Sequence, residues 1–140
     1  MQSIVINAAD AIVQYLNGKT YNDRQIPFIR KLIPEKTLAQ GKKLTGYVVP
    51  HSLQQTMGTR SAKDNTITID IGIMGRASEH QLEEMLALTQ QIGESLYDLS
   101  FEQDFRIVEV NYDPLYDVNS WLELHAFVAV ISITIVKRKD

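Results

Sequence analysis

The sequence predicts an α+β fold, with a mainly antiparallel sheet of about four to five strands packed against one long and one short helix. Three observations lead to this prediction. Isoleucine alternates with polar or small residues over positions 66–73, apolar residues recur at helical spacing over 79–99, and a β-branched run ends a strand over 121–136. The elements follow the order α-β-β-β-α-β-β, and 140 residues suit a single domain over residues 1–140.

A short helix is predicted first, over residues 8–17. Asn7 is a favourable N-cap, and Gly18 supplies a stop signal at the other end. Between them the apolar residues recur at helical spacing. These residues are Ala8, Ala11, Ile12, Tyr15 and Leu16.

Three segments of the first half follow that helix. Residues 25–33 contain Pro27 and precede Pro34, so they predict an edge or irregular strand, because proline cannot donate to a central ladder. Residues 44–49 predict a short strand that ends at a proline. Residues 51–65 are polar and lack periodicity, so we expect a long exposed loop, and loops of that length are usually functional or mobile.

The second half begins with the alternating strand 66–73, whose four isoleucines share one face. Ser78 and Gln81 form a capping box at the start of the main helix, residues 79–99. Residues 105–111 predict another strand, and a turn-rich connection over 112–120 leads to the last one.

The last strand, residues 121–136, is apolar at consecutive positions, which is typical of a strand covered on both faces. The helix 79–99 can cover one face. The short first helix is the only other helix in the prediction, so a neighbouring subunit is a candidate for the second face. The β-branched residues of the run are Val128, Val130, Ile131, Ile133, Ile135 and Val136.

Composition and charge exclude several classes of protein. A net charge of −3 argues against general binding to nucleic acid, and the absence of cysteine excludes disulfides and thiolate chemistry. No secretory signal is recognised, and the apolar run 126–136 is shorter than the roughly 20 residues of a membrane helix. Basic residues gather over 19–43 and acidic residues over 94–123. These are either two solvated faces of opposite sign or a head-to-tail contact between copies.

No motif predicts a catalytic, metal or cofactor site. His80 with Glu83 and Glu84 has a spacing that suits two metal ligands, but a solvated helix surface explains it better. The glycines before Arg76 lie where phosphate loops occur without forming such a motif. Asp70 has no second carboxylate at a diagnostic spacing. A small ligand-binding or enzymatic domain that uses Asp70, Arg76 or His80 therefore stays an alternative, which predicts a pocket gathering these groups.

Several segments, read in order, resemble the tail-terminator or tail-completion proteins of tailed bacteriophages, which lie at the neck. The resemblance covers most of the chain, and the order and spacing of the segments carry it. The segments are 8–17 ending Tyr-Leu-Asn, 30–34 followed by Leu38, Tyr-Val-Val-Pro at 47–50, Thr-Arg at 59–60, Ile-Asp-Ile-Gly-Ile at 69–73, the amphipathic 82–96, Asn-Tyr-Asp-Pro-Leu-Tyr at 111–116 and Ile-Thr-Ile-Val at 133–136.

The resemblance implies an α+β subunit, made in the host cytoplasm, that assembles into a ring, commonly a hexamer, in the virion. The ring caps the tail tube protein and meets the head connector or head-closure protein, and it carries no catalytic residues and no cofactor. DNA passing through the ring would not be read by sequence. A head-closure (stopper) protein or another neck component is the alternative within this class.

We expect subunit contacts between the basic and acidic regions, with tyrosine and tryptophan beside the acidic residues; core packing is the alternative explanation for these aromatic side chains. The candidate interface residues are Lys31, Lys36, Lys42, Lys43, Arg60, Glu102, Asp104, Asp113, Tyr116, Asp117 and Trp121.

Overall fold

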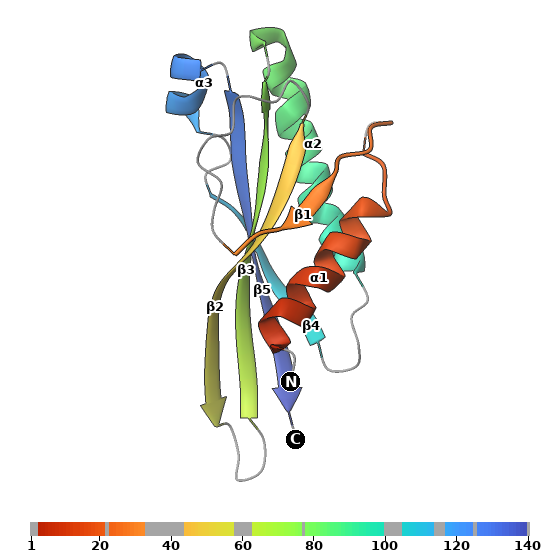
Figure 1. Ribbon diagram of the computed structural model, residues 1–140, viewed down its shortest axis with the longest axis vertical. Coiled ribbons are helices and arrows are strands. Elements are labelled where there is room, and N and C mark those ends of the chain that lie inside the picture. Colours follow the sequence, from red (N-terminus) through yellow and green to blue (C-terminus); the bar gives the residue numbers. More distant parts are fainter. Residues whose placement is uncertain are drawn as a thin grey trace.

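The α+β class is confirmed by the computed structural model, which describes residues 3–21, 23–32, 44–57, 63–76, 78–99, 105–113, 117–124 and 126–139 (Figure 1). Its elements are α1 (Ile4–Asn17), β1 (Phe28–Arg30), β2 (Thr45–Met57), β3 (Lys63–Arg76), a 3₁₀ turn (Glu79–Gln81), α2 (Leu82–Ser95), a second 3₁₀ turn (Leu96–Asp98), β4 (Phe105–Tyr112), α3 (Val118–Leu124) and β5 (Ala126–Lys139).

Among the described residues the sheet has five strands in the order β1-β2-β3-β5-β4, and their pairings are antiparallel except that of β1 with β2. β3 and β5 form its centre and pair along their whole length, from Lys63 opposite Lys139 to Arg76 opposite Ala126. β1 lies at one edge, as predicted from the prolines that flank it in the sequence, Pro27 and Pro34. The two layers thus consist of one sheet and the helices on it.

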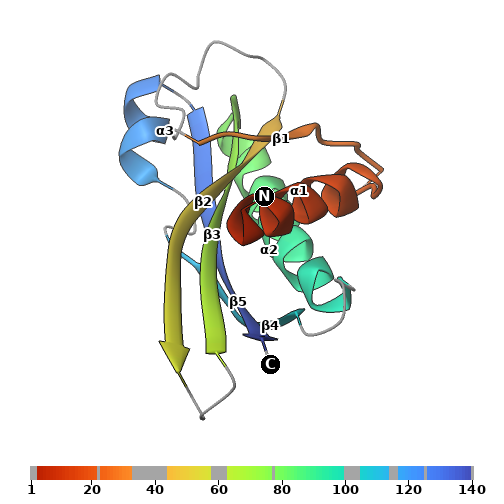
Figure 2. The ribbon, with the colours of Figure 1, turned by 60° about the horizontal axis from the view of Figure 1, so that its bottom comes forward.

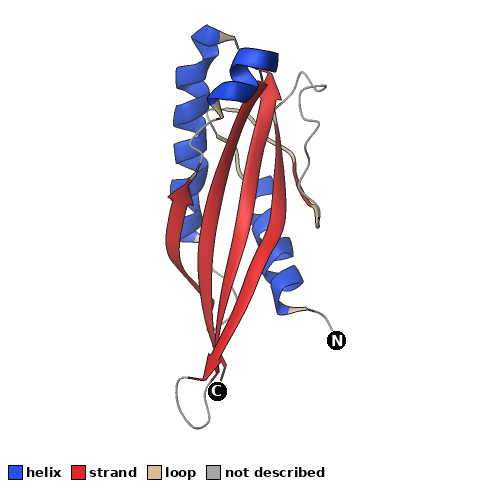
Figure 3. Cartoon of the chain, turned by 90° about the vertical axis from the view of Figure 1, so that its left-hand side faces the viewer, coloured by secondary structure: helices blue, strands red, loops and turns tan. Residues whose placement is uncertain are grey.

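Helices α1 and α2 lie on the same side of the sheet (Figures 1 and 2). The opposite side faces the viewer in Figure 3, where only α3 lies over one end of the strands among the described elements. We call this side the open face. Its residues in the two central strands are Thr66, Thr68, Asp70, Gly72 and Met74 of β3, and Val128, Val130, Ser132, Thr134 and Val136 of β5.

The core lies between the sheet and the two helices, and strict alternation along the central strands builds it. Ile67, Ile69, Ile71 and Ile73 of β3 are fully buried, as predicted for that strand. In β5, Phe127 and every second residue from it to Ile135 are likewise fully buried. The helices complete the core with Ala8, Ala9, Ile12 and Leu16 from α1 and Met85, Leu88 and Ile92 from α2.

Polar side chains fix the helices to each other and to the sheet. Asn17 Nδ2 donates to the carbonyl of Phe28 at 2.9 Å, and the Phe28 amide donates to Asn17 Oδ1 at 2.8 Å. The hydroxyl of Tyr15 donates to the carbonyl of Ser95 at 2.6 Å, while Tyr21 Oη lies 2.8 Å from Ser95 Oγ. The end of α1 is thereby attached to both β1 and α2.

The predicted start of the first helix is wrong by four residues. α1 begins at Ile4, and Ser3 is its N-cap, accepting a hydrogen bond from the Val5 amide at 3.3 Å. Asn7 therefore lies inside the helix. Ile4 and Val5 are half-buried against the core, and this apolar contact extends the helix by a turn. The helix ends at Asn17, as predicted.

The long exposed loop predicted over residues 51–65 is also wrong over 51–57 and 63–65, while residues 58–62 lie outside the described residues. β2 continues past Pro50 to Met57, and β3 already begins at Lys63. A register shift between Pro50 and Ser52 absorbs His51 as a bulge. Proline is tolerated there because β1 pairs only with residues 46–48, which leaves β2 at the edge of the described sheet.

The last strand starts later than predicted. Residues 121–124 belong to the short helix α3, and β5 runs from Ala126 to Lys139. Asp117 starts this helix: its Oδ1 accepts from the Asn119 amide at 3.2 Å and its carbonyl from the Trp121 amide at 3.3 Å. The main helix occurs as predicted, with a 3₁₀ turn at each end, and Gln81 Oε1 accepts from the Ser78 amide at 2.9 Å.

Candidate functional site on the open face of the sheet

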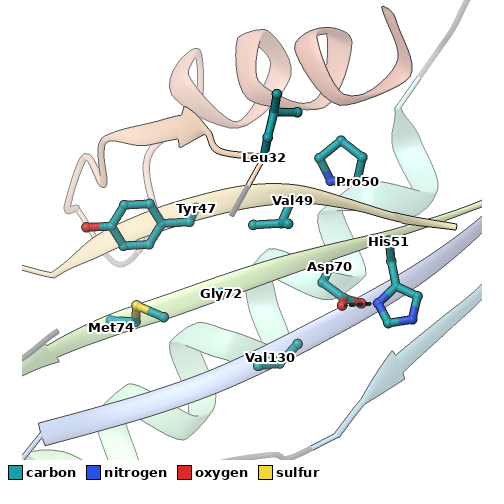
Figure 4. Close-up of a pocket in the computed structure, with 9 residues that line it drawn as sticks. All are labelled: Leu32, Tyr47, Val49, Pro50, His51, Asp70, Gly72, Met74 and Val130. Atoms are coloured by element: carbon teal, nitrogen blue, oxygen red, sulfur yellow. Dashed lines mark hydrogen bonds and ion pairs between the residues drawn. The ribbon is translucent and has the colours of Figure 1, made fainter. Parts of the chain in front are cut away.

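The open face contains a hollow of about 220 Å³ (Figure 4). Three neighbouring strands and Leu32, the second residue after β1, contribute to it, and Gly72, which has no side chain, lies in the middle of its floor. The lining residues are Leu32, Tyr47, Val49, Pro50, His51, Asp70, Gly72, Met74 and Val130.

One end of the hollow is polar. His51 Nδ1 lies 2.9 Å from Asp70 Oδ2, and the Ser132 hydroxyl donates to Asp70 Oδ1 at 2.6 Å. Both oxygens of this carboxylate thus have a partner. The side chain of Asp70 is 27% exposed, whereas that of His51, raised on the bulge of β2, is 61% exposed.

This cluster contains the residue types of a serine hydrolase in a different arrangement. In the Ser-His-Asp triad the imidazole stands between the hydroxyl and the carboxylate and takes the proton of the hydroxyl. Here Asp70 stands between His51 and Ser132, and the hydroxyl donates to the carboxylate. A carboxylate in that position anchors Ser132 without making it a nucleophile. The cluster therefore fixes the polar end of the hollow.

The rest of the hollow is apolar and partly open to solvent. Tyr47, Val49 and Val130 are half-buried, and Leu32 is 66% exposed. The ammonium of Lys31 lies 5.8 Å from the centroid of the Tyr47 ring, within the range of a cation–π contact. An apolar centre with charged and polar groups around it is the usual composition of a protein-binding surface.

Four of the predicted interface residues fall in the described part of the chain. Lys31 lies beside the hollow through Tyr47. Asp113 and Asp117 donate their amides to the carbonyls of Val130 and Val128, at 3.0 and 2.7 Å, so both lie along the first part of β5. Trp121 is half-buried in α3. The predicted residues Lys36, Lys42, Lys43, Arg60, Glu102, Asp104 and Tyr116 lie outside the described residues.

Two residues of the basic region have partners within the same chain. Arg24 Nη2 lies 3.1 Å from Glu84 Oε1 in α2, and Arg30 Nε lies 2.7 Å from Asp10 Oδ1 in α1. These pairs are one-third to one-half exposed, so each contributes about 0–1 kcal/mol to folding. They also reduce the charge that the basic region presents to another copy.

The aromatic residue Tyr112 packs against α2. Its hydroxyl donates to the carbonyl of Gln90 at 3.2 Å, and its ring occupies the space that a side chain at Gly93 would need. Burial raises the pKa of Tyr112, and the charges of Glu94 and Tyr97 raise it further. Core packing therefore accounts for this tyrosine.

The structure does not gather the three residues of the enzymatic alternative in the hollow. Asp70 lines it, but Arg76 is at the end of β3 opposite Ala126, and His80 is in an exposed 3₁₀ turn. Within the described ranges, no group of three or more histidine, aspartate or glutamate side chains is placed to hold a metal ion. His51 was not predicted as a residue of this site, because the strand was expected to end at Pro50 and His51 to lie in a loop. β2 in fact continues to Met57.

No protein-family model matches the sequence, and no curated protein shows a significant match. Among the described helices, none has both the length and the apolar character needed to cross a membrane.

Proposed function

We propose that this protein is the subunit of a homo-oligomeric ring at the head–tail neck of a tailed bacteriophage, a tail terminator that caps the tail tube and joins it to the head connector. One observation carries the proposal. The central strands bury one face under α1 and α2, while no described helix covers the hollow on the open face. The resemblance of the sequence to tail-terminator proteins supports a place for this surface in a virion.

The chemistry of the open face suits contact with protein. Val128, Val130 and Val136 of β5 are half-buried rather than covered, and β-branched residues exposed on a sheet gain from further burial. The polar groups at the end of the hollow already bond to one another, since Asp70 has both His51 and Ser132 as partners. An incoming surface would therefore cover the Asp70 carboxylate without leaving either of its oxygens unpaired.

The short helix α3 extends the apolar area beyond the hollow. Leu122 is 63% exposed and Val118 is 47% exposed, and the helix lies over the end of β5. A ring needs a heterologous contact, in which one patch of each subunit meets a different patch of the next. We assign the open face, with α3 at its end, to one side of that contact.

The size of the hollow favours this function over the binding of a small ligand. Pockets for drug-sized ligands have volumes of about 300–1,000 Å³ and bury most of the ligand. A hollow of about 220 Å³ with the exposed Leu32 on its margin is smaller and shallower. One or two side chains of a neighbouring subunit would fill it.

Native mass spectrometry and negative-stain electron microscopy of the purified protein test the proposal. We expect a ring, with six copies as the commonest number for this class of protein. Val130→Asp should reduce the assembly to smaller species, because it puts a charge into the apolar contact, while the far-ultraviolet circular dichroism stays unchanged. Tyr97→Asp is the matched control, since Tyr97 is 60% exposed in the turn after α2.

A strictly monomeric wild-type protein that is absent from purified virions would contradict the proposal. The alternative within the same class is a head-closure or stopper ring. The position of the gene distinguishes the two, because a terminator gene usually precedes the gene of the tail tube protein.

A further inference from the structure

Within the described part of the chain, the second half of β2 has no partner on its outer side. β1 pairs only with Gly46, Tyr47 and Val48, and the Lys31 amide adds one bond to the Val48 carbonyl at 2.9 Å. From there β2 continues to Met57, paired with β3 on its inner side. Figures 1 and 2 show that this half forms the margin of the sheet, with no other described element beside it. We call residues 51–57 the free edge.

The free edge lacks the features with which proteins usually protect such strands. An unpaired edge exposes backbone N–H and C=O groups that can join another strand, and charged residues, prolines or bulges normally prevent this. The free edge reads His-Ser-Leu-Gln-Gln-Thr-Met, without a lysine, arginine, aspartate, glutamate or proline. Pro50 lies before it and the bulge is at its first residue, His51, so the six residues that follow are regular.

The opposite edge of the sheet differs in this respect. β4 carries Arg106 and Glu109, and its register with β5 shifts between Ile107 and Glu109. Charges and a bulge in an eight-residue strand are the protection that the free edge lacks. The two edges are thus not equally suited to accept another strand.

We propose that the free edge pairs with the same segment of a second copy, antiparallel across a two-fold axis, so that one sheet continues through both subunits. A neutral segment meets itself without placing like charges opposite each other, and its serine, glutamines and threonine can bond across the pair. Leu53, which is 42% exposed although it lies opposite the buried Ile67, would be covered by the partner. Two-fold contacts of this isologous kind are the commonest between identical subunits.

This inference does not depend on the proposed ring. A ring requires heterologous contacts, which we place on the open face, whereas the free edge lies at the margin of the sheet. A two-fold contact would pair free subunits or join two rings. The variant Val130→Asp, which should disrupt the ring, should leave the pairing of the free edge intact.

The absence of cysteine allows a clean test by disulfide cross-linking. Ser52→Cys, Gln54→Cys and Thr56→Cys each place one thiol on the open-face side of the free edge, opposite Thr68, Thr66 and Asp64 of β3. With an axis through Gln54, Gln54→Cys should link to itself, and a mixture of the other two variants should link to each other. An axis one residue away should instead link Gln54→Cys with one of its two neighbours.

Two results would overturn the inference. One is that no combination cross-links more than Val108→Cys, a control on the exposed bulge of β4. The other is that Gln54→Cys links preferentially to Val108→Cys, which would mean that β4 of the next copy occupies the free edge.

A charge substitution provides an independent measurement in solution. Gln54→Lys puts two ammonium groups near the axis, so we expect the affinity of the dimer to fall about tenfold. Sedimentation velocity at several protein concentrations measures this affinity. Val108→Lys adds the same charge at the other edge and should leave the affinity unchanged. Equal affinities for Gln54→Lys and the wild-type protein would contradict the pairing.

Discussion

Gly46 is a position where β2 has no room for a side chain. A Cβ atom there would overlap the ring of Phe28, which is buried in the core. We expect Gly46→Ala to lower the free energy of unfolding by about 1–3 kcal/mol, the usual cost of overpacking. Urea unfolding measures the change. Gly18→Ala is the control, because its nearest neighbours are at 3.5 Å and its φ of −82° suits alanine.

Tyr21 makes the stability of the protein depend on pH in the alkaline range. Burial raises the pKa of its phenol above the ordinary value of 10.0, against a smaller opposing effect of the hydrogen bond with Ser95. Since the folded state holds this proton more tightly than the unfolded state, the stabilisation is complete below pH 10 and is lost as the pH rises through the pKa of the folded state. Stability should therefore fall at alkaline pH.

Tyr21→Phe should reduce that fall, because phenylalanine has no proton to lose. The variant should also lose about 1 kcal/mol at neutral pH, where it lacks the hydrogen bond to Ser95. Urea unfolding at pH 7 and at pH values above 10 separates the two effects. A pH dependence identical to that of the wild-type protein would show that Tyr21 titrates normally.

At the scale of elements, Asn17 connects the end of α1 to the edge strand β1. Its side chain both donates to and accepts from the backbone of Phe28. Asn17→Ala leaves these two backbone groups without partners, so we expect a loss of about 1–3 kcal/mol in the free energy of unfolding. Gln25→Ala removes a single exposed hydrogen bond to the Asn17 carbonyl, and its effect in the same measurement should be smaller.

Neighbouring residues of β5 should respond differently to truncation. Ile131 is fully buried under the helices, and Ile131→Ala should cost about 2–5 kcal/mol in chemical unfolding. Val130 lines the hollow on the open face. Val130→Ala should cost less than Ile131→Ala in the isolated subunit and should mainly weaken the assembly. A larger cost for Val130→Ala than for Ile131→Ala would contradict the position of the core on the helix side of the sheet.

The elements that were predicted correctly are those whose pattern is local. The isoleucines of β3 alternate, and the residues of α2 recur every three or four positions, so each element shows which face it buries. The end of β2 has no such pattern, because residues 51–57 are mostly polar and take their conformation from pairing with β3. The helix α3 has seven residues, too few for periodicity to distinguish it from the start of a strand.

The candidate site was less accessible to prediction than the fold. Asp70 and Ser132 are 62 residues apart, and only the pairing of β3 with β5 brings them together. The bulge that aims His51 at Asp70 depends on the register of β2, which no local signal gives. The expectation that β5 is covered on its second face came from the sequence, because β-branched residues occupy consecutive positions, and it stays a prediction.

For the whole molecule, the uneven distribution of helices leads us to expect that the proposed ring is held chiefly by apolar contact. Arg24 and Arg30 are paired within the chain, which reduces the charge available between subunits. We therefore expect the ring to persist when sodium chloride rises from about 0.1 to about 0.5 M, although the Debye length falls from about 10 Å to less than half of that. Analytical ultracentrifugation at both concentrations measures this. A ring that dissociates in salt would instead assign the contact to the charged regions.

The pairing of β3 with β5 also determines how the chain reaches this structure. β2 and β3 are adjacent in sequence and can form a hairpin within microseconds, whereas β3 must wait for a strand that follows it by about two helices and another strand. Topologies dominated by such distant pairings fold slowly, in milliseconds to seconds. Until β5 arrives, the isoleucine-rich strand at the centre of the sheet has an unoccupied side, and during synthesis this nascent hairpin is the segment most exposed to misassociation and to capture by chaperones.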